Sequence, residues 1–300
     1  MINIEKMTES TFEQAVELIS RLQSDNSHHI GYFGTTSEEL IPYIKELEPN
    51  WKETSLLAYE GKQLIGLLII EYDLELEHAW LHGPMVDYID WQTVANTLIS
   101  TSMLEIIPKS IQDLELCGDV SNDNLRLFAE AHKFKSSDPS ALLSFKCKDL
   151  EKLNSIQDPN IIKLNEEFFE SFQQLHDKIW PNSYFSGKQL IERRSDRNKI
   201  LLNIVGKKLR GYIRGGVEPG GKEGYIDFVT VNEDDRRKGI GKGLVTAITK
   251  WLLSSFEITS VGLSVYDTNI PAVNLYKKIG FNHARSIQGY RKKPAKTEVT

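Results

Sequence analysis

Apolar residues recur along the chain with two spacings, the alternation typical of strands and the wider spacing typical of helices, and the order of these segments occurs twice. The first set predicts a helix over residues 11–23 and strands over residues 2–7, 55–59, 64–72 and 78–84. The second set predicts a helix over residues 166–179 and strands over residues 161–164, 200–205, 210–215 and 225–231. Each set continues with a helix, a strand, a second helix and terminal strand material. This order predicts an α/β fold (of the α+β, mixed-sheet kind) with helices on both faces of the sheet.

Short matching stretches support an internal duplication. The turn sequence Gly-Lys-Gln-Leu-Ile-Gly at residues 61–66 has a counterpart in Gly-Lys-Lys-Leu-Arg-Gly at residues 206–211. Asn122 has a counterpart in Asn269 at nearly the same separation along the chain. Similar separations of independent matches favour two copies of one unit over chance similarity.

We therefore predict two domains, over residues 1–146 and 159–300, joined by a polar linker over residues 147–158. Charge distinguishes the two halves of the chain. Residues 1–150 carry 11 basic and 25 acidic side chains, whereas residues 151–300 carry 25 basic and 17 acidic ones. Only the C-terminal half is suited to bind an anion. The net charge of −6 argues against a nucleic-acid partner.

Composition also bears on where the protein works. The longest apolar stretch, residues 64–70, is far shorter than the ~20 residues that span a bilayer, so we expect no membrane partner. The beginning of the chain has no pattern of a secretory signal. Cys117 and Cys147 match no metal-binding spacing. We expect a reduced, cytoplasmic protein, and the sequence indicates no oligomeric state.

The segment from residue 225 to residue 243 predicts an anion site. Its strand leads through a polar turn into Arg236-Arg237-Lys238-Gly239-Ile240-Gly241-Lys242-Gly243. Helical spacing begins inside this glycine run, so free amide groups and the positive end of a helix dipole meet there. Glycines let a phosphate approach the backbone closely, and the basic side chains add positive charge. A helix start whose glycines serve only packing is the alternative interpretation.

A second segment follows about thirty residues later. Asn269 stands two residues before Pro271, as in a helix cap with proline in the first turn, and Gly280 predicts the end of that helix. Tyr276 lies on the apolar face of the predicted helix. Capping alone explains Asn269 as an alternative, and core packing alone explains Tyr276.

Together these segments resemble the GNAT superfamily of acyl-CoA N-acyltransferases. The similar residues are Arg236-x-x-Gly239-x-Gly241 after a strand and, later, Asn269-x-x-Ala272-x-x-Leu275-Tyr276-x-x-x-Gly280-Phe281. The duplication is similar to that of tandem GNAT proteins. The resemblance implies two tandem GNAT folds, acetyl-CoA as co-substrate, no metal, and an amine acceptor on a small molecule or a peptide.

The resemblance also implies roles for individual residues. In the family the sheet splays after the strand matching residues 225–231, and the pantetheine arm inserts there. Backbone groups of Val229 and Val231 would contact the arm and the thioester carbonyl. Asn269 would contact the arm, and Tyr276 would act as general acid. The pyrophosphate would be bound by the amides of Arg237, Lys238, Gly239, Ile240, Gly241 and Lys242, with Arg236 adding charge.

The chemistry of direct transfer can be argued from the residues themselves. A strand amide stabilises the oxyanion formed when an amine attacks a thioester, and the hydroxyl of Tyr276 can protonate the departing thiolate. Tyr225 stands where many family members carry a carboxylate, so we take Asp227 as the base, with Glu223 second. The alternative interpretation, in which Asp227 is only a polar residue of the strand, remains open. The sequence thus predicts an N-acetyltransferase, with a non-catalytic acyl-CoA-binding or regulatory module as the alternative.

The first copy lacks the cofactor features. The positions that correspond to Arg236, Gly239, Gly241, Tyr276 and Gly280 are occupied by Ile89, Gln92, Val94, Ala129 and Lys133. We therefore predict a degenerate GNAT-like domain and one acyl-CoA per chain. This domain would either shape the acceptor pocket or only bury the sheet edge of its partner.

Two further groups of residues carry weaker hypotheses. His28, His29, His78 and His82 have no evident third ligand, so no metal site is predicted. Trp180, Tyr184 and Phe185 either line the acceptor site or belong to the core.

Overall fold

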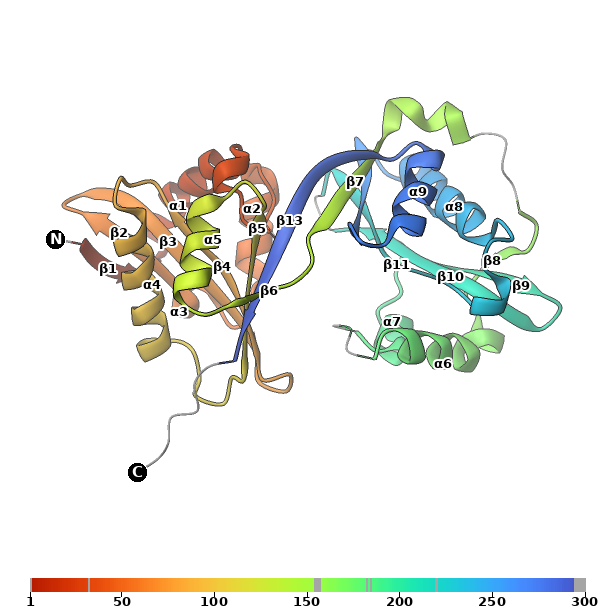
Figure 1. Cartoon of the computed structure of the whole chain (residues 1–300), viewed down its shortest axis with the longest axis horizontal. Coiled ribbons are helices and arrows are strands. Elements are labelled where there is room, and N and C mark those ends of the chain that lie inside the picture. Colours follow the sequence, from red (N-terminus) through yellow and green to blue (C-terminus); the bar gives the residue numbers. More distant parts are fainter. Residues whose placement is uncertain are drawn as a thin grey trace. The chain divides into compact units, whose positions relative to one another are not determined.

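The chain divides into two compact units (Figure 1). The computed structural model describes residues 2–31, 33–153, 158–181, 183, 185–218 and 221–293. Unit 1 comprises the described residues of Met1–Ser140 and Ser286–Thr300, and unit 2 comprises those of Ala141–Arg285. Tyr184 and residues 154–157 of the predicted linker lie outside the described residues. No helix of the described residues is both long and apolar enough to cross a lipid bilayer.

Unit 1 is a mixed sheet covered by helices. The order of its strands is β1 (Ile2–Lys6), β2 (Ser55–Glu60), β3 (Gln63–Asp73), β4 (His78–Val86), β5 (Asp113–Asp119) and β13 (Asn282–Lys292), with β6 (Lys135–Ser136) beside β13. Only β4 and β5 are parallel; the other neighbours are antiparallel. Seven consecutive residues of β3 are buried, which requires cover on both faces. The helices are α1 (Glu9–Gln23), η1 (Asn26–His28), α2 (Ser37–Glu46), α3 (Trp51–Thr54), α4 (Trp91–Glu105) and α5 (Asp123–Ala131).

Unit 2 repeats this plan. The order of its strands is β7 (Ser140–Lys146), β12 (Ser260–Tyr266), β11 (Glu223–Val231), β10 (Lys208–Val217), β9 (Asn198–Val205) and β8 (Ile161–Lys163). The helices are η2 (Cys147–Leu153), η3 (Glu166–Phe168), α6 (Phe169–Ile179), α7 (Gly187–Glu192), η4 (Glu233–Asp235), α8 (Ile240–Ser255) and α9 (Ile270–Ile279). Figure 1 shows α6 and α7 on one side of β10 and β11, and α8 and α9 on the other. The predicted α/β class with a mixed sheet and helices on both faces is confirmed.

The helix ends follow the local sequence. Asn269 caps α9, because its side-chain oxygen accepts a hydrogen bond from the amide of Ala272 at 3.3 Å. Gly280 ends α9 with a φ of +117°, a conformation that glycine adopts without a Cβ clash. Gly239 stands at the start of α8 with a φ of +83°. The capping interpretation of Asn269 is therefore confirmed, whatever else this residue contacts.

Each sheet is completed by a strand from the other end of the sequence. β7 follows the last helix of the first copy but pairs with β12 in unit 2. Residues 287–292 of β13 follow unit 2 along the chain but pair with β5 in unit 1. Tyr290 anchors β13 in the core of unit 1, and Phe145 anchors β7 in the core of unit 2. The predicted boundaries at residues 146 and 159 divide the sequence into two copies of a repeat, whereas the two units are defined by contacts in space. The boundaries of the repeat therefore stay a prediction.

This exchange gives a test on Tyr290. Replacing a large buried aromatic side chain with alanine typically costs about 3–5 kcal/mol, so Tyr290→Ala should lower the unfolding midpoint clearly. Hydrogen exchange of the β5 amides should accelerate in the same variant, because β13 protects that edge.

Tyr266→Ala is the matched control, since Tyr266 ends a strand but is 56% exposed. Its stability should change by less than about 0.5 kcal/mol. Equal effects of the two substitutions would show that β13 contributes no core to unit 1.

Candidate active site

The parallel strands β11 and β12 of unit 2 are paired along only part of their length. Their register runs from Glu223 opposite Ser260 to Ile226 opposite Leu263. β11 continues to Val231 and β12 continues to Tyr266 without further pairing between them. The facing edges over residues 229–231 and 264–266 therefore present backbone donors and acceptors that an extended ligand can use as an added strand.

A β-bulge lies where this pairing ends. On β10, Arg214 is opposite Phe228 and Gly215 is opposite Ile226, so Asp227 has no opposite residue. The bulge changes which side chains face each layer: Ile226 packs in the core beside α8, whereas Phe228 packs in the core beside α6. Such bulges re-aim side chains and backbone groups and are frequent beside active sites.

Asp227 forms an ion pair with Arg214, and the two side chains are about equally buried. Burial raises the pKa of the Asp227 carboxyl, and the neighbouring guanidinium opposes this shift. An aspartate in this setting binds a proton more readily than an exposed one, while Arg214 favours its ionised form. The base role of Asp227 stays a prediction.

The turn between β11 and α8 has the backbone geometry of an anion nest. Arg237 and Gly239 both have positive φ values, +62° and +83°. Alternation of this kind points successive N–H groups toward the same side. The first helical bond runs from the Gly243 amide to the Gly239 carbonyl at 3.0 Å. Within the part of the chain that the structure describes, the amides of residues 237–242 have no acceptor.

Asp235 fixes the base of this turn. Its buried carboxylate accepts hydrogen bonds from Arg210 at 3.1 Å and from Lys238 at 2.9 Å, and it pairs with Lys208 at 3.1 Å. The Lys238 ammonium, followed by the other two cations, holds the pKa of this carboxyl far below its usual range. Sequence reasoning missed Asp235, although an acid directly before a basic run is a readable signal.

The basic side chains of the turn therefore have unequal roles. Lys238 is bound to Asp235, and the Arg236 guanidinium donates to the Val231 carbonyl at 3.3 Å. Arg237 and Lys242 are exposed, and neither forms an ion pair with another described residue. Of these four basic side chains, those of Arg237 and Lys242 are therefore available to contact an anion bound at the nest.

Helix α9 lies against the start of α8. A Cβ added to Gly241 would lie 3.3 Å from Leu275 and 3.7 Å from Val231, so the turn, α9 and β11 meet at this glycine. Tyr276 is 4% exposed and contacts Phe281. Burial raises the pKa of the Tyr276 phenol to about 12. The structure thus places the predicted catalytic and cofactor-binding residues in unit 2, on β11, in the turn, in the first residues of α8 and at α9 with its cap.

A cavity of about 240 Å³ lies at the bulge. It is lined by Ser195, Arg197, Asn198, Arg214, Gly216, Val217, Glu218, Glu223, Tyr225 and Asp227. The Glu223 carboxylate accepts a hydrogen bond from the Ser260 hydroxyl, so Glu223 is held to β12. Asp227 is the acid that lies at the end of the β11–β12 pairing.

Two of the predicted aromatic residues can be placed. The Trp180 indole packs against Phe228 and donates to the Thr230 hydroxyl at 3.1 Å, yet it is 38% exposed. Phe185 packs in the core beside α6 and under the Arg193 guanidinium. Trp180 therefore lies beside the part of β11 that extends beyond its pairing with β12, and Phe185 packs against the core beside α6.

The corresponding strands of unit 1 separate in the same way. β4 and β5 are paired from His78 opposite Asp113 to Leu81 opposite Leu116, and then part. In unit 1, other residues of the same chain bind the edge of β5 that extends beyond its pairing with β4. The Gly31 amide donates to the Cys117 carbonyl at 2.8 Å, and the Asp119 amide donates to the His29 carbonyl at 3.0 Å.

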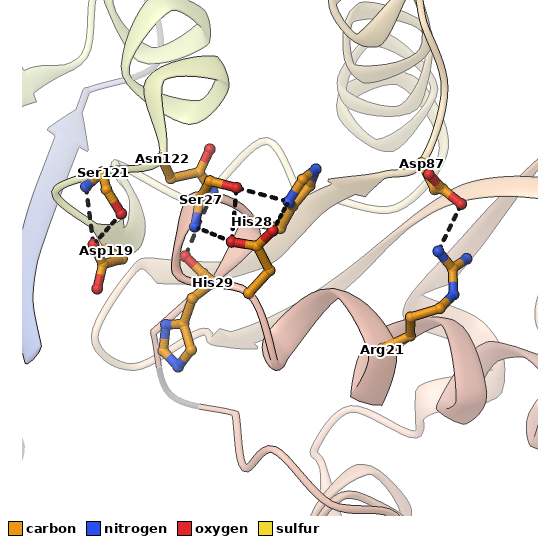
Figure 2. A network of polar contacts seen from close by, with 9 residues as sticks. Arg21, Ser27, His28, His29, Asp87, Asp119, Ser121 and Asn122 are labelled. Atoms are coloured by element: carbon orange, nitrogen blue, oxygen red, sulfur yellow. Dashed lines mark hydrogen bonds and ion pairs between the residues drawn. The ribbon is translucent and has the colours of Figure 1, made fainter.

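The segment His29–Ile30–Gly31 is held on its other side as well. The Gln23 side chain accepts from the Ile30 amide at 2.7 Å and donates to the Ile30 carbonyl at 2.9 Å. Gln23 and Ile30 are fully buried. Figure 2 shows Asn122, the counterpart of Asn269, beside His29; its amide donates to the His29 carbonyl at 3.5 Å.

Other features of unit 1 differ from those of unit 2. Pro84 stands on β4 where β11 has Val229, and proline has no N–H to offer a ligand. The turn after β4 is acidic: Asp87 pairs with Arg21 at 2.8 Å (Figure 2) and Asp90 caps α4. Among the described residues, no group of three or more His, Cys, Asp and Glu side chains is arranged to hold a metal ion.

A match to a known protein family lies within unit 2. Residues 163–281 match the profile of the Acetyltransferase (GNAT) family. An N-alpha-acetyltransferase of Sulfurisphaera tokodaii is 38% identical over 69 residues, which is 23% of this chain and 41% of that protein. The N-terminal acetyltransferase B complex catalytic subunit NAA20 of Arabidopsis thaliana is 28% identical over 148 residues, 49% of this chain and 75% of that protein.

Solved structures extend the similarity of fold to almost the whole chain. A GCN5-related N-acetyltransferase from Sphaerobacter thermophilus superposes with a TM-score of 0.74 at 11% identity, covering 97% of this chain and 95% of that one. A tandem GNAT protein from the clavulanic acid biosynthesis pathway gives a TM-score of 0.68 at 11% identity, covering 98% and 99%. Residues 163–281 thus match the GNAT family of acetyltransferases, and almost the whole chain has the fold of proteins with two GNAT domains in tandem.

Proposed function

We propose that unit 2 is an N-acetyltransferase that transfers an acetyl group from acetyl-CoA to an amine by direct attack. The observation that carries the proposal is the combination of a parting strand pair with an amide nest at the start of α8. The parted edges suit an extended arm, and the nest suits a diphosphate at one end of it. The residues present therefore fit coenzyme A.

The binding roles follow the positions of the groups. The pyrophosphate would accept hydrogen bonds from the amides of residues 237–242, with Arg237 and Lys242 as the free cations. Backbone groups of Val229 and Val231 would pair with the arm. The Asn269 side-chain amide is available to the arm, because only its oxygen is used in capping. The own-chain contact of Asn122 in unit 1 supports this role by analogy.

The chemical step uses few groups. The amine nitrogen bonds to the thioester carbon, and a β11 amide beside the bulge stabilises the oxyanion, by about 3 kcal/mol for one donor. The C–S bond then breaks, the thiolate takes a proton from Tyr276, and the amine loses its extra proton to Asp227, directly or through water. The raised pKa keeps Tyr276 protonated, as a general acid must be.

For the acceptor we propose an amine on a peptide or a small molecule, with the α-amine of a peptide N-terminus first to be tested. The printed names of the relatives favour this order: they include several N-alpha-acetyltransferases, a streptothricin acetyltransferase and a spermine/spermidine N(1)-acetyltransferase. The cavity beside Asp227 lies where such an amine would approach. We propose the cytoplasm as the setting, consistent with the unpaired Cys117 and Cys147.

Gly239 provides a test of the nest. Gly239→Ala meets no steric obstacle but is strained at a φ of +83°, so the turn must shift. We expect acetyl-CoA affinity, measured by titration calorimetry, to fall roughly tenfold, which corresponds to about 1.4 kcal/mol.

Gly206→Ala is the matched control, because Gly206 has a φ of +62°, equally open surroundings and a place in the β9–β10 turn. It should cost similar stability and leave the affinity unchanged. Equal losses of affinity in both variants would show that the amide nest at the start of α8 does not bind acetyl-CoA.

Tyr276 provides a test of the acid. With Tyr276→Phe we expect kcat to fall by about 10²–10⁴-fold while acetyl-CoA binding is kept, measured by thiol release with a panel of free-amine peptides, spermidine and glucosamine. Because the pKa of Tyr276 is about 12, the wild-type rate should rise with pH as the amine deprotonates and show no falling limb below about pH 11.

An unchanged kcat in Tyr276→Phe would show that Tyr276 is not the general acid. Retained acetyl-CoA binding without turnover on any acceptor would instead support the non-catalytic acyl-CoA-binding module.

Unit 1 provides a test of stoichiometry. Its parted strands are filled by residues 29–31, and Pro84 offers no amide, so we expect one acetyl-CoA per chain. Titration calorimetry on the full chain should give a stoichiometry near one. In Gly239→Ala the remaining weak binding should still fit one site. A second site of similar affinity would contradict the proposal that unit 1 is degenerate.

A further inference from the structure

The cavity at the β11 bulge contains more charged groups than the proposed base and its partner. Its lining includes two arginines and three acids: Arg197, Arg214, Glu218, Glu223 and Asp227. Arg214 and Asp227 form an ion pair, and the Glu223 carboxylate accepts a hydrogen bond from Ser260. Arg197 and Glu218 form no ion pair with another described residue. One cation and one anion of the lining are therefore left to meet the charges of a ligand.

Backbone carbonyls hold the Arg197 guanidinium in place. Its Nε donates to the Val217 carbonyl at 3.1 Å, and its Nη2 donates to the Glu218 carbonyl at 2.6 Å. The Arg197 carbonyl accepts from the Val217 amide at 2.9 Å, so the main chain and the side chain are both bound to the end of β10. The guanidinium carbon also lies 5.6 Å from the centre of the Phe256 ring. A side chain held in this way loses little further freedom when it binds a ligand.

These contacts leave donors and charge for a ligand. A guanidinium has five N–H donors, and the two carbonyls use only a part of them. Carbonyls have no net charge, so the positive charge of Arg197 is not neutralised by them. A carboxylate matches a guanidinium in both charge and geometry, and charge-assisted hydrogen bonds are roughly twice as strong as neutral ones. Arg197 is therefore suited to bind a carboxylate on a molecule that enters the cavity.

We propose that the acceptor is an amine that carries a carboxylate, and that Arg197 is the specificity-determining residue that binds this carboxylate. The inference rests on the proposed function and names the class of amine. The carboxylates of Asp227 and Glu218 face the amine, and Arg197 supplies the opposite charge in the same cavity. A volume of about 240 Å³ is smaller than the pockets of about 300–1,000 Å³ that hold drug-sized ligands, so it suits one amino acid or the first residue of a peptide.

Paired acceptors distinguish the two sources of such a carboxylate. Alanine and alaninamide test a free amino acid. An amidated tripeptide that begins with glutamate, and the same peptide beginning with glutamine, test an acidic side chain at a peptide N-terminus. In at least one pair we expect kcat/KM of the wild type to favour the charged member by roughly tenfold or more, the ratio typical of a hydrogen bond to a charged group. The amine of alaninamide is less basic than that of alanine, so amine ionisation does not explain a preference for alanine.

Arg197→Gln is the principal test, because it removes the charge and keeps a hydrogen-bond donor. We expect the preference for the charged member to disappear, through a higher KM for that member. KM for acetyl-CoA should change by less than about twofold, since no residue of the anion nest lines the cavity. A merely structural role of Arg197 would lower activity on both members of a pair alike and leave their ratio unchanged, which would overturn the inference.

Arg194→Gln is the matched control. Arg194 likewise donates to a backbone carbonyl, that of Ile191 at 2.8 Å, and its guanidinium lies 4.4 Å from the centre of the Phe169 ring. Arg194 does not line the cavity. This variant should therefore keep the preference of the wild type. Loss of the preference in Arg194→Gln as well would show that the carboxylate is not bound by Arg197 specifically.

Calorimetry tests the carboxylate site without turnover. With coenzyme A in excess, the charged member of the preferred pair should bind the wild type roughly tenfold or more tightly than the neutral member, and Arg197→Gln should remove this difference. Turnover of both members of each pair at equal kcat/KM would overturn this inference and leave the proposed function standing. A wild type that acetylates no amine would overturn the proposed function, and equal calorimetric affinities would then overturn the carboxylate site as well.

Discussion

Backbone amides and carbonyls that leave a β-ladder need other partners, and this requirement governs both units of the molecule. In each unit one parallel strand pair parts after four residue pairs. Unit 1 satisfies the free edge of β5 with its own residues 29–31, which Gln23 holds from the other side. Unit 2 has a β-bulge and an amide-rich turn at the same place. The same backbone geometry therefore yields a closed unit in one case and a candidate binding site in the other.

Charge follows the same division. The turn after β11 and the first residues of α8 together contain four basic residues, but the buried Asp235 binds Lys238 together with Lys208 and Arg210 from β10. This arrangement stabilises the turn as a scaffold and leaves the remaining cations for a ligand. In unit 1, Asp87 and Asp90 occupy the equivalent turn, where an anionic ligand would meet repulsion.

Features that depend on neighbouring residues could be predicted from the sequence. The cap at Asn269, the stop at Gly280 and the glycine start of α8 all follow from local backbone preferences, and the structure has each of them. Features that join distant residues could not be predicted. Asn122 is a readable cap, but its contact with His29 spans 93 residues. The buried His176 joins α6 to Tyr212 of β10 and to the Phe185 carbonyl, and nothing in the local pattern distinguishes His176 and Tyr212 from ordinary core residues.

The crossed destinations of β7 and β13 affect how the polypeptide matures. β13 follows residues 141–285 along the chain, so it can pair with β5 only after those residues have been synthesised. During translation the nascent N-terminal half keeps an open sheet edge, which is prone to pairing with other chains. Either half expressed separately would also carry a strand that belongs elsewhere. Both units therefore reach their final strand order only once the whole chain has been made, which ties their maturation together.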